Sequence, residues 1–227
     1  MDKFAVIVAG GTGSRMGNSV PKQFIEVGGK PLLLYTIDAF LKAFVDIQLM
    51  VVLPEIHLET GKAFIEKAYA NSSSIRVTTG GVTRFESVRN GILHAPDSSI
   101  IFVHDAVRCM VSPELIRNCY EVAKSKGSAI PVVSIKDSIR QITISGSEVV
   151  NRDTLRAVQT PQTFHSEILK QAFALPYNEA FTDEATVVEF SGGTVELMEG
   201  EETNIKVTYP ADLLLAEQYF LKASQSF

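Results

Sequence analysis

Short apolar runs alternate with amphipathic stretches along most of this chain. The apolar runs are rich in β-branched residues, which is typical of buried strands, and they lie at 4–8, 47–53, 75–79, 100–103 and 129–133. Between them, apolar residues recur at helical spacing and predict helices over 31–44, 55–70, 83–94 and 113–125. This alternation predicts an α/β, Rossmann-like fold, in which a mostly parallel sheet is flanked by helices on both faces.

The alternation stops between about 137 and 159, where a turn at Gly146 separates two short segments. This pattern predicts a β-hairpin, and a two-stranded ribbon is marginal unless another surface supports it. The hairpin either folds back on its own domain or serves as a dimerisation arm, and the sequence leaves both open. Beyond it the pattern predicts helices over 166–174, 183–190 and 210–223 and a strand over 194–198.

Composition narrows the class of protein. The 227 residues suit a single domain spanning 1–227 with the arm attached, and the net charge of −5 argues against non-specific nucleic-acid binding. The two cysteines form no metal-type spacing with the four histidines and suggest no disulfide framework. No signal-peptide pattern and no membrane-spanning apolar run stands out, so we expect a cytoplasmic protein with no membrane partner.

The first strand leads into a glycine-rich loop, A-G-G-T-G-S-R-M-G at 9–17, followed by P-K-Q-F at 21–24. Such a loop presents backbone N–H groups to an anion, and the cations Arg15 and Lys22 suit a triphosphate. The loop is not a dinucleotide fingerprint, G-x-G-x-x-G, because Met16 stands where the third glycine belongs. It is not a P-loop, G-x-x-x-x-G-K-[ST], because the residue directly before Lys22 is not a glycine. The alternative is a tight turn with incidental basic residues.

Two further loops follow predicted strands, and ligands bind beyond the carboxyl ends of strands in such sheets. One carries Gly80 and Gly81 with Ser87 one helical turn later, where backbone groups could read a pyrimidine. The other carries Asp105, whose carboxylate suits Mg²⁺, and Arg108, whose planar fork suits a phosphate. The alternatives are an ordinary helix start and an exposed ion pair of little energetic weight.

The glycine loop and the P-K-Q after it resemble the opening signature of sugar- and polyol-phosphate nucleotidyltransferases. The ending P-K-Q-F is similar to one branch, the 2-C-methyl-D-erythritol 4-phosphate cytidylyltransferase family. Similar elements continue in the family's order along nearly the whole chain: G-G-V-T-R-F-E-S-V at 80–88, H-D-A-V-R at 104–108, R-D-T-L at 152–155, T-P-Q-T-F at 160–164, T-D-E-A at 182–185 and N-I-K-V-T at 204–208. The resemblance implies an enzyme that joins CTP to 2-C-methyl-D-erythritol 4-phosphate and releases pyrophosphate, in non-mevalonate isoprenoid biosynthesis.

The resemblance also implies residue roles. Catalysis at the phosphates would fall to Arg15, Lys22 and Lys206. Nucleotide contacts would come from Ala9, Gly10, Gly11, Gly13, Gly80, Gly81, Ser87 and Ala106. The polyol phosphate would meet Asp105, Arg108, Arg152, Thr160 and Thr182, with Asp105 near Mg²⁺. Arg152 would reach the site from the arm of the neighbouring subunit, which makes a homodimer with shared active sites the expected assembly.

Two positions depart from the family pattern. Val82 stands where some relatives carry an aspartate, so a side-chain contact to the base is not expected there. Val107 replaces an alanine of H-D-A-A-R, a change that relatives acting on ribitol 5-phosphate also show. A ribitol-5-phosphate cytidylyltransferase is therefore the nearest alternative, and a nucleotide-binding module without activity is a more distant one. A turnover assay separates the three.

Overall fold

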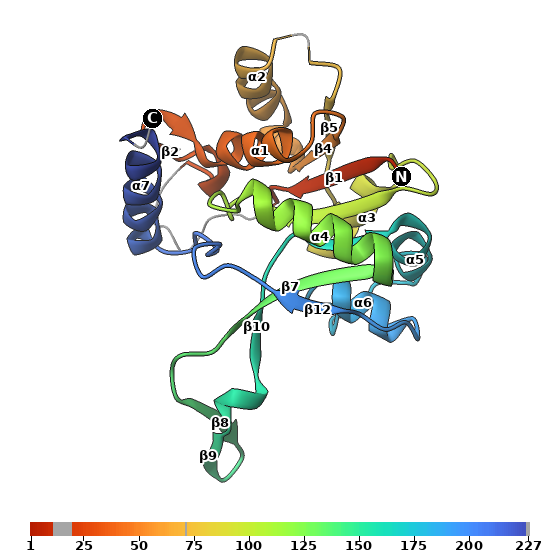
Figure 1. Cartoon of the computed structure of the whole chain (residues 1–227), viewed down its shortest axis with the longest axis vertical. Coiled ribbons are helices and arrows are strands. Elements are labelled where there is room, and N and C mark those ends of the chain that lie inside the picture. The colour runs from red at the N-terminus through yellow and green to blue at the C-terminus, as the bar shows by residue number, and fades with distance from the viewer. Residues whose placement is uncertain (11–19, 71, 226–227) are drawn as a thin grey trace.

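The computed structural model describes residues 1–10, 20–70 and 72–225. Its central sheet has the strand order β10-β7-β11-β6-β1-β4-β5, with β12 also pairing with β7 (Figure 1). The strands are β1 Lys3–Val8, β4 Gln48–Leu53, β5 Ile75–Thr79, β6 Ile100–Asp105, β7 Ser128–Ser134, β10 Arg156–Val158, β11 Gln162–His165 and β12 Leu197–Glu199. Strands β6, β1, β4 and β5 are parallel neighbours, which confirms the predicted α/β fold with its mostly parallel sheet.

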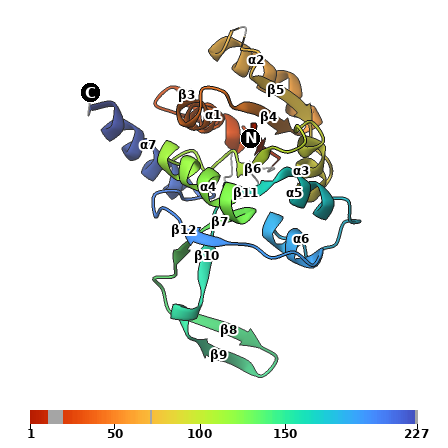
Figure 2. The same ribbon diagram turned by 45° about the vertical axis from the view of Figure 1, so that its right-hand side comes forward.

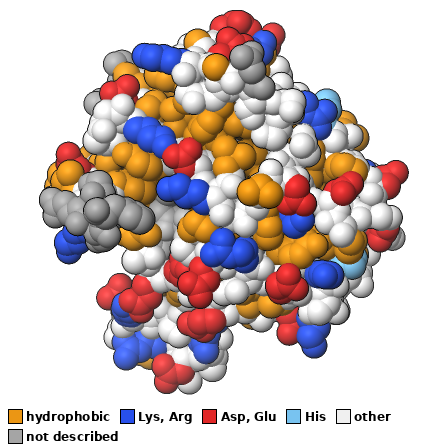
Figure 3. Space-filling view, turned by 45° about the horizontal axis from the view of Figure 1, so that its top comes forward, with side chains coloured by type: hydrophobic (Ala, Val, Ile, Leu, Met, Phe, Trp, Pro, Cys, Tyr) orange, Lys and Arg blue, Asp and Glu red, His pale blue; other side chains and the backbone are white. Residues whose placement is uncertain are grey.

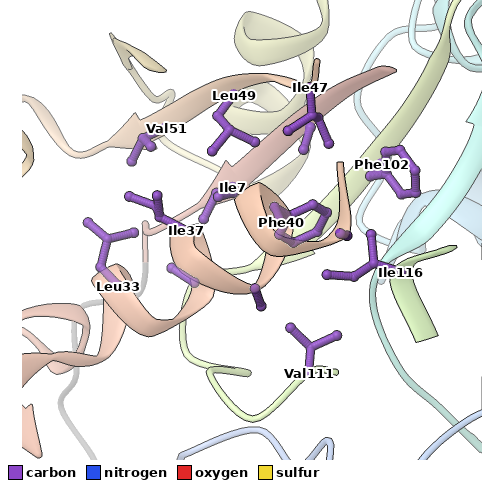
Figure 4. Close-up of a cluster of buried hydrophobic side chains, with 14 of the residues drawn as sticks. Ile7, Leu33, Ile37, Phe40, Ile47, Leu49, Val51, Phe102, Val111 and Ile116 are labelled. Carbon is purple, nitrogen blue, oxygen red and sulfur yellow. The ribbon is translucent and has the colours of Figure 1, made fainter. Parts of the chain in front are cut away.

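Helices cover both faces of this sheet, as Figures 1 and 2 show. They are α1 Leu32–Ala43, α2 Leu58–Ala68, α3 Arg84–Ile92, α4 Pro113–Lys126, α5 Ser166–Ala172, α6 Glu184–Phe190 and α7 Pro210–Gln225. Alternate residues of β1 serve the two faces, since Ile7 packs with α1 and α4 while Val6 packs with α3 and α5. Figure 4 shows Ile37 and Phe40 of α1 pointing toward Ile7 and Leu49 in the first of these cores.

Strand β11 is the main element that the hydrophobic pattern missed. It is antiparallel to both β6 and β7 and lies between them, with Gln162 opposite Val103. The strand is short and follows Pro161 directly, so its four residues carry no periodic signal of their own. Because β11 begins beside the end of β6, Thr160, two residues before β11, lies at the carboxyl edge of the sheet.

Two local predictions were wrong. The segment over 55–70 begins as a 3-10 turn, Glu55–His57, before α2, and this shifts the helical phase. The helical spacing predicts that Ile56 and Ala68 face the core, but Ile56 lies in the 3-10 turn and is 83% exposed, and Ala68, the last residue of α2, is exposed as well. The strand expected over 194–198 is observed as β12 at Leu197–Glu199.

The predicted hairpin is confirmed as β8 Ile139–Thr143 and β9 Gly146–Val150, which form a separate two-stranded sheet. It projects away from the main sheet as an arm (Figures 1 and 2), but the predicted span of about 137–159 is too long at its end, because Arg156–Val158 form β10 and pair with β7 in the main sheet. The arm exposes the apolar side chains of Ile142, Ile144 and Val149. Its use in dimerisation stays a prediction.

Lys and Arg side chains are interspersed with Asp and Glu over the face drawn in Figure 3. Among residues 1–10, 20–70 and 72–225, none of the helices has the length and apolar content needed to cross a bilayer.

Candidate active site

The residues directly after β1, β5 and β6 meet at the carboxyl edge of the parallel strands, as the topology requires. There they surround a pocket of about 190 Å³. The lining includes Ala9, Gly10, Lys22, Gly81, Ser87, Asp105 and Lys206. Segments that lie far apart in the sequence therefore contribute to one cavity.

The loop at Gly80 and Gly81 is held by the first turn of α3. Ser87 Oγ accepts a hydrogen bond from the Gly81 N–H at 3.1 Å and donates one to the Thr83 carbonyl at 3.0 Å. Thr83 and Glu86 form a reciprocal capping box, which satisfies two N–H groups at the start of the helix. A Cβ at Gly80 would lie 2.7 Å from Ser87 Oγ, so this close packing requires glycine. Ser87 thus shapes the loop, and a base entering here would meet mainly backbone groups.

Asp105 is the electrostatic centre of the pocket. Its carboxylate lies 2.8 Å from Lys206 Nζ, 3.2 Å from Arg84 Nη2 and 3.8 Å from Arg108 Nε, and its side chain is only 10% exposed. Burial alone would raise the pKa of Asp105, but the three cations outweigh it and hold the pKa well below its usual range. The carboxylate is therefore ionised and can orient Lys206 and Arg84 at the same time.

Arg84 and Glu184 form a second ion pair that the sequence analysis did not single out. Glu184, whose side chain is 1% exposed, accepts two hydrogen bonds from the Arg84 guanidinium, one of them from Nη2 at 3.2 Å. Arg84 is thus fixed between the carboxylates of Glu184 and Asp105. Both residues lie inside quoted motifs, G-G-V-T-R and T-D-E-A, but no local spacing connects positions 84 and 184.

The two expected catalytic lysines that the structure describes both line the pocket. Lys206 Nζ pairs with Asp105, and Lys22 Nζ lies 3.5 Å from the Val207 carbonyl oxygen. The Val207 N–H in turn donates to the Val107 carbonyl at 3.0 Å, which ties the segment carrying Lys206 to the loop after β6. The remaining predicted residues of the glycine loop, Gly11, Gly13 and Arg15, lie outside the described residues.

Arg108 and Thr160 lie beside the pocket and bond to protein groups. The Arg108 guanidinium donates to the carbonyls of Asn204 at 2.8 Å and Val158 at 3.3 Å. Thr160 is 5% exposed, and its Oγ accepts a hydrogen bond from the Asp105 N–H. A phosphate reaching Arg108 would therefore meet a guanidinium whose orientation is already set.

Three other predicted site residues, Ala106, Thr182 and Arg152, are not part of the pocket lining. Ala106 is buried and its N–H bonds to the Val8 carbonyl, so that N–H is used within the protein. Thr182 is exposed at the start of α6, with its hydroxyl 3.3 Å from that of Thr186. Arg152 is exposed on the arm, where it donates to the Lys136 carbonyl. Neither Thr182 nor Arg152 lines the pocket of this chain.

The residues present suit a magnesium ion only if the substrate supplies most of the ligands. No group of three His, Cys, Asp or Glu side chains within the described ranges is placed to hold a metal. Asp105 lines the pocket as an ionised carboxylate, and Mg²⁺ is commonly bound by one or two carboxylates together with substrate phosphates and water. Burial raises the pKa of the Cys109 and Cys119 thiols to about 12, so neither offers a thiolate ligand.

Known proteins similar to this chain were found by sequence and by fold. The family described as 2-C-methyl-D-erythritol 4-phosphate cytidylyltransferase matches residues 4–222. A protein of that name from Phocaeicola vulgatus is 43% identical over 217 residues, which cover 96% of this chain and 99% of the relative. One from Bacteroides thetaiotaomicron is 44% identical over 213 residues, covering 94% and 97%.

The fold comparison agrees with the sequence comparison. The crystal structure of 4-diphosphocytidyl-2C-methyl-D-erythritol synthase from Anaerococcus prevotii superposes with a TM-score of 0.81 at 27% identity, covering 97% of this chain and 96% of the other. That of 2-C-methyl-D-erythritol 4-phosphate cytidylyltransferase from Thermus thermophilus has a TM-score of 0.75 at 32% identity, covering 96% and 98%.

Proposed function

Since the chain belongs to the 2-C-methyl-D-erythritol 4-phosphate cytidylyltransferase family, we propose that the pocket around Asp105 brings its two substrates together. The enzyme transfers a cytidylyl group from CTP to 2-C-methyl-D-erythritol 4-phosphate in isoprenoid biosynthesis. The products are 4-diphosphocytidyl-2-C-methyl-D-erythritol and pyrophosphate. Val107 does not redirect the assignment to ribitol 5-phosphate, because the matching family and the relatives above carry the methylerythritol name.

The chemistry requires no protein nucleophile. A phosphate oxygen of the acceptor attacks the α-phosphorus of CTP in line and pyrophosphate leaves, so catalysis consists of positioning and charge stabilisation. The single observation that supports this role is the convergence of Lys22 and Lys206 on one pocket, with Lys206 oriented by the ionised Asp105 at 2.8 Å. In the proposal both ammonium groups, together with Arg15, meet the charge that grows on the α-phosphoryl group.

The two substrates are proposed to occupy different sides of Asp105. Ala9, Gly10 and the Gly81 loop line the side assigned to the nucleotide, where Gly10 and Gly81 admit a close approach of backbone to ligand. Arg108 and the exposed Thr182 are assigned to the acceptor phosphate. When bound, Mg²⁺ neutralises part of the triphosphate charge, and Asp105 is the residue that would hold it.

The arm is proposed to complete the site in a homodimer. Ile142 and Ile144 are exposed on it, and an exposed apolar ribbon is stabilised when a second surface covers it. In a two-fold dimer each arm would contact the other subunit, so Arg152 of the partner subunit would reach the acceptor phosphate. The proposal also places the enzyme in the cytoplasm, since both cysteines are free thiols.

The substrates are tested by measuring CTP-dependent pyrophosphate release with each acceptor and nucleotide. Release is expected to be fastest with CTP and 2-C-methyl-D-erythritol 4-phosphate and to require Mg²⁺. Faster release with ribitol 5-phosphate, or with UTP in place of CTP, would contradict the assignment. Binding of CTP without any release would favour a nucleotide-binding module.

The shared site is tested by mixing two inactive variants, Arg152→Ala and Lys22→Ala, under conditions in which subunits exchange. In a mixed dimer one site combines the intact Lys22 of one chain with the intact Arg152 of the partner subunit, and the other site carries both lesions. Activity is expected to return toward half that of the wild-type dimer, scaled by the fraction of mixed dimers. If exchange is demonstrated and no activity returns, Arg152 does not act across the interface.

A further inference from the structure

The turn that carries Asp105 and Arg108 is hydrogen-bonded to β1 and to α1. The Ala106 N–H donates to the Val8 carbonyl of β1 at 2.9 Å, and the Ala106 carbonyl accepts from Thr36 Oγ of α1 at 2.8 Å. Within the turn, the Arg108 N–H donates to the Asp105 carbonyl at 3.0 Å. The bonds to β1 and α1 fix the middle of the turn, and the bond from Arg108 to Asp105 joins its two ends once.

His104 and Thr160 hold those ends, and the chemistry of the partners sets the direction of each bond. The Arg108 carbonyl can only accept, so His104 Nε2, 3.2 Å away, must carry the hydrogen. A neutral imidazole carries hydrogen on only one of its two ring nitrogens, so with that hydrogen on Nε2 the Nδ1 atom is an acceptor. Thr160 Oγ, 3.0 Å from Nδ1, therefore donates to the ring and accepts from the Asp105 N–H at 3.1 Å.

We propose that His104 and Thr160 are positioning residues, which fix the backbone of Asp105 relative to that of Arg108 through this chain of hydrogen bonds. The chain runs from the Asp105 N–H through Thr160 and His104 to the Arg108 carbonyl and so closes the turn from the inside. His104 is 0% exposed and cannot touch a substrate. The inference rests on the proposed function, in which Asp105 orients Lys206 and Arg108 meets the acceptor phosphate.

The physical reason is the sensitivity of phosphoryl transfer to geometry. A displacement of about 1 Å in a positioning group can reduce the rate on the order of 100-fold. Thr160 comes from the segment before β11, whereas Asp105 ends β6, so the chain of bonds also couples two strands at the edge of the pocket.

The first test compares Thr160→Val, which removes the hydroxyl at nearly constant shape, with Thr160→Ser, which keeps it. Thr160→Val is expected to lower kcat/KM for the acceptor roughly 10- to 100-fold, with KM for CTP within about twofold. Thr160→Ser is expected to recover most of the loss. Thr163→Val is the matched control, because Thr163 is also buried and its hydroxyl lies 3.5 Å from the Pro161 carbonyl instead of bonding to the turn. Equal losses in the Thr160→Val and Thr163→Val variants would overturn the proposal.

Two substitutions at His104 distinguish a positioning role of Thr160 from a direct contact between Thr160 and the substrate, because His104 is buried and can act only through the hydrogen-bond chain. His104→Asn keeps an acceptor near the Nδ1 position and loses the donor, whereas His104→Gln keeps a donor near Nε2 and loses the acceptor. Each is expected to lower kcat/KM for the acceptor by roughly tenfold or more while KM for CTP changes little. Wild-type kinetics in both variants would overturn the proposal.

The tautomer is measured without any substrate, by ¹⁵N NMR of the imidazole rings. The chain has four histidines, and the His104 signals are identified by their loss in His104→Gln. We expect a neutral ring protonated at Nε2, with the Nδ1 signal shifting in Thr160→Val because a hydrogen bond is lost. An Nδ1–H tautomer would contradict the inference, even if the enzyme uses the proposed substrates. Failure to use those substrates would contradict the proposed function. The measured tautomer would still test whether the hydrogen bonds run from Asp105 through Thr160 and His104 to Arg108.

Discussion

The turn after β6 and the arm both lie outside the regular packing of helices on the sheet. They differ in side-chain exposure, since most side chains of the turn are buried and several apolar side chains of the arm are exposed. His104, Asp105 and Ala106 are buried, and the turn is bonded to β1, to α1 and to the segment before β11. On the arm, Ile144 and Ile142 are exposed. Groups whose chemistry needs a fixed geometry lie in the first region, and the second has an apolar surface suited to a partner.

Two ion pairs show the same contrast in energetic terms. Lys206 and Asp105 lie 2.8 Å apart with the carboxylate 10% exposed, whereas Lys136 and Glu202 lie 2.6 Å apart near the base of the arm with side chains 71% and 70% exposed. Water screens the second pair, which is expected to contribute about 0–1 kcal/mol. Burial makes the first pair much more sensitive to the loss of one partner. Similar distances therefore predict different consequences.

The largest expected effect on kcat comes from removing Lys206, and removing Lys136 from the exposed pair is its control. Lys206→Ala is expected to lower kcat on the order of 10²–10³, because charge developing in the transition state loses its partner. Lys136→Ala should leave kcat within about twofold, since its pair is solvated. Steady-state kinetics check both. If Lys206→Ala raises only KM, the lysine supplies uniform binding and the assigned role is wrong.

The next effect concerns the arm. Ile144→Asp is expected to abolish dimer formation by placing a charge in the proposed interface, and activity should fall roughly tenfold or more as the shared site is lost. Val45→Asp is the matched control, since Val45 is 100% exposed in the loop after α1 and away from the arm. Light scattering and turnover measure the outcome. A monomeric wild-type protein with full activity would contradict both the proposed dimer and the shared active site.

A smaller effect is expected from Glu184→Gln, which removes the buried carboxylate beside Arg84. The guanidinium would keep Asp105 as a partner but lose a charged one, so the free energy of unfolding is expected to drop by about 2–4 kcal/mol. Glu202→Gln on the solvated pair should change it by less than about 1 kcal/mol. Denaturant titration of both variants makes the comparison. Equal decreases in the free energy of unfolding in the two variants would mean that burial does not make the Arg84–Glu184 pair more important for stability than the exposed Lys136–Glu202 pair.

The smallest effect is the response to acid. The cations around Asp105 hold its pKa below the unfolded value, so its contribution to stability is present above about pH 4 and is lost as pH falls further. Between pH 6 and 3 this should amount to on the order of 1 kcal/mol, measured as the difference in urea stability between wild type and Asp105→Asn. The same acid sensitivity in both proteins would show that other carboxylates account for it.

The sequence by itself determined the order and type of most elements. Alternating apolar runs and helical spacing predicted β1, α1, β4, β5, α3, β6, α4 and β7, because strand and helix periods are local properties of the chain. It also identified the hairpin from the turn at Gly146. The parallel topology then predicted correctly that the segments carrying Lys22, Gly81 and Asp105 meet at one edge.

Only the tertiary structure decided which distant groups pair. Arg84 and Glu184 are separated by 100 positions, and Thr160 reaches the Asp105 N–H because the short strand β11 inserts between β6 and β7. No periodic pattern predicts such contacts, since they depend on how packed layers bring side chains together. A buried polar group must find its partner there, because leaving it unpaired in an apolar interior is costly. Packing therefore decided the hydrogen bonds behind the pocket, whereas the local sequence determined the elements that carry them.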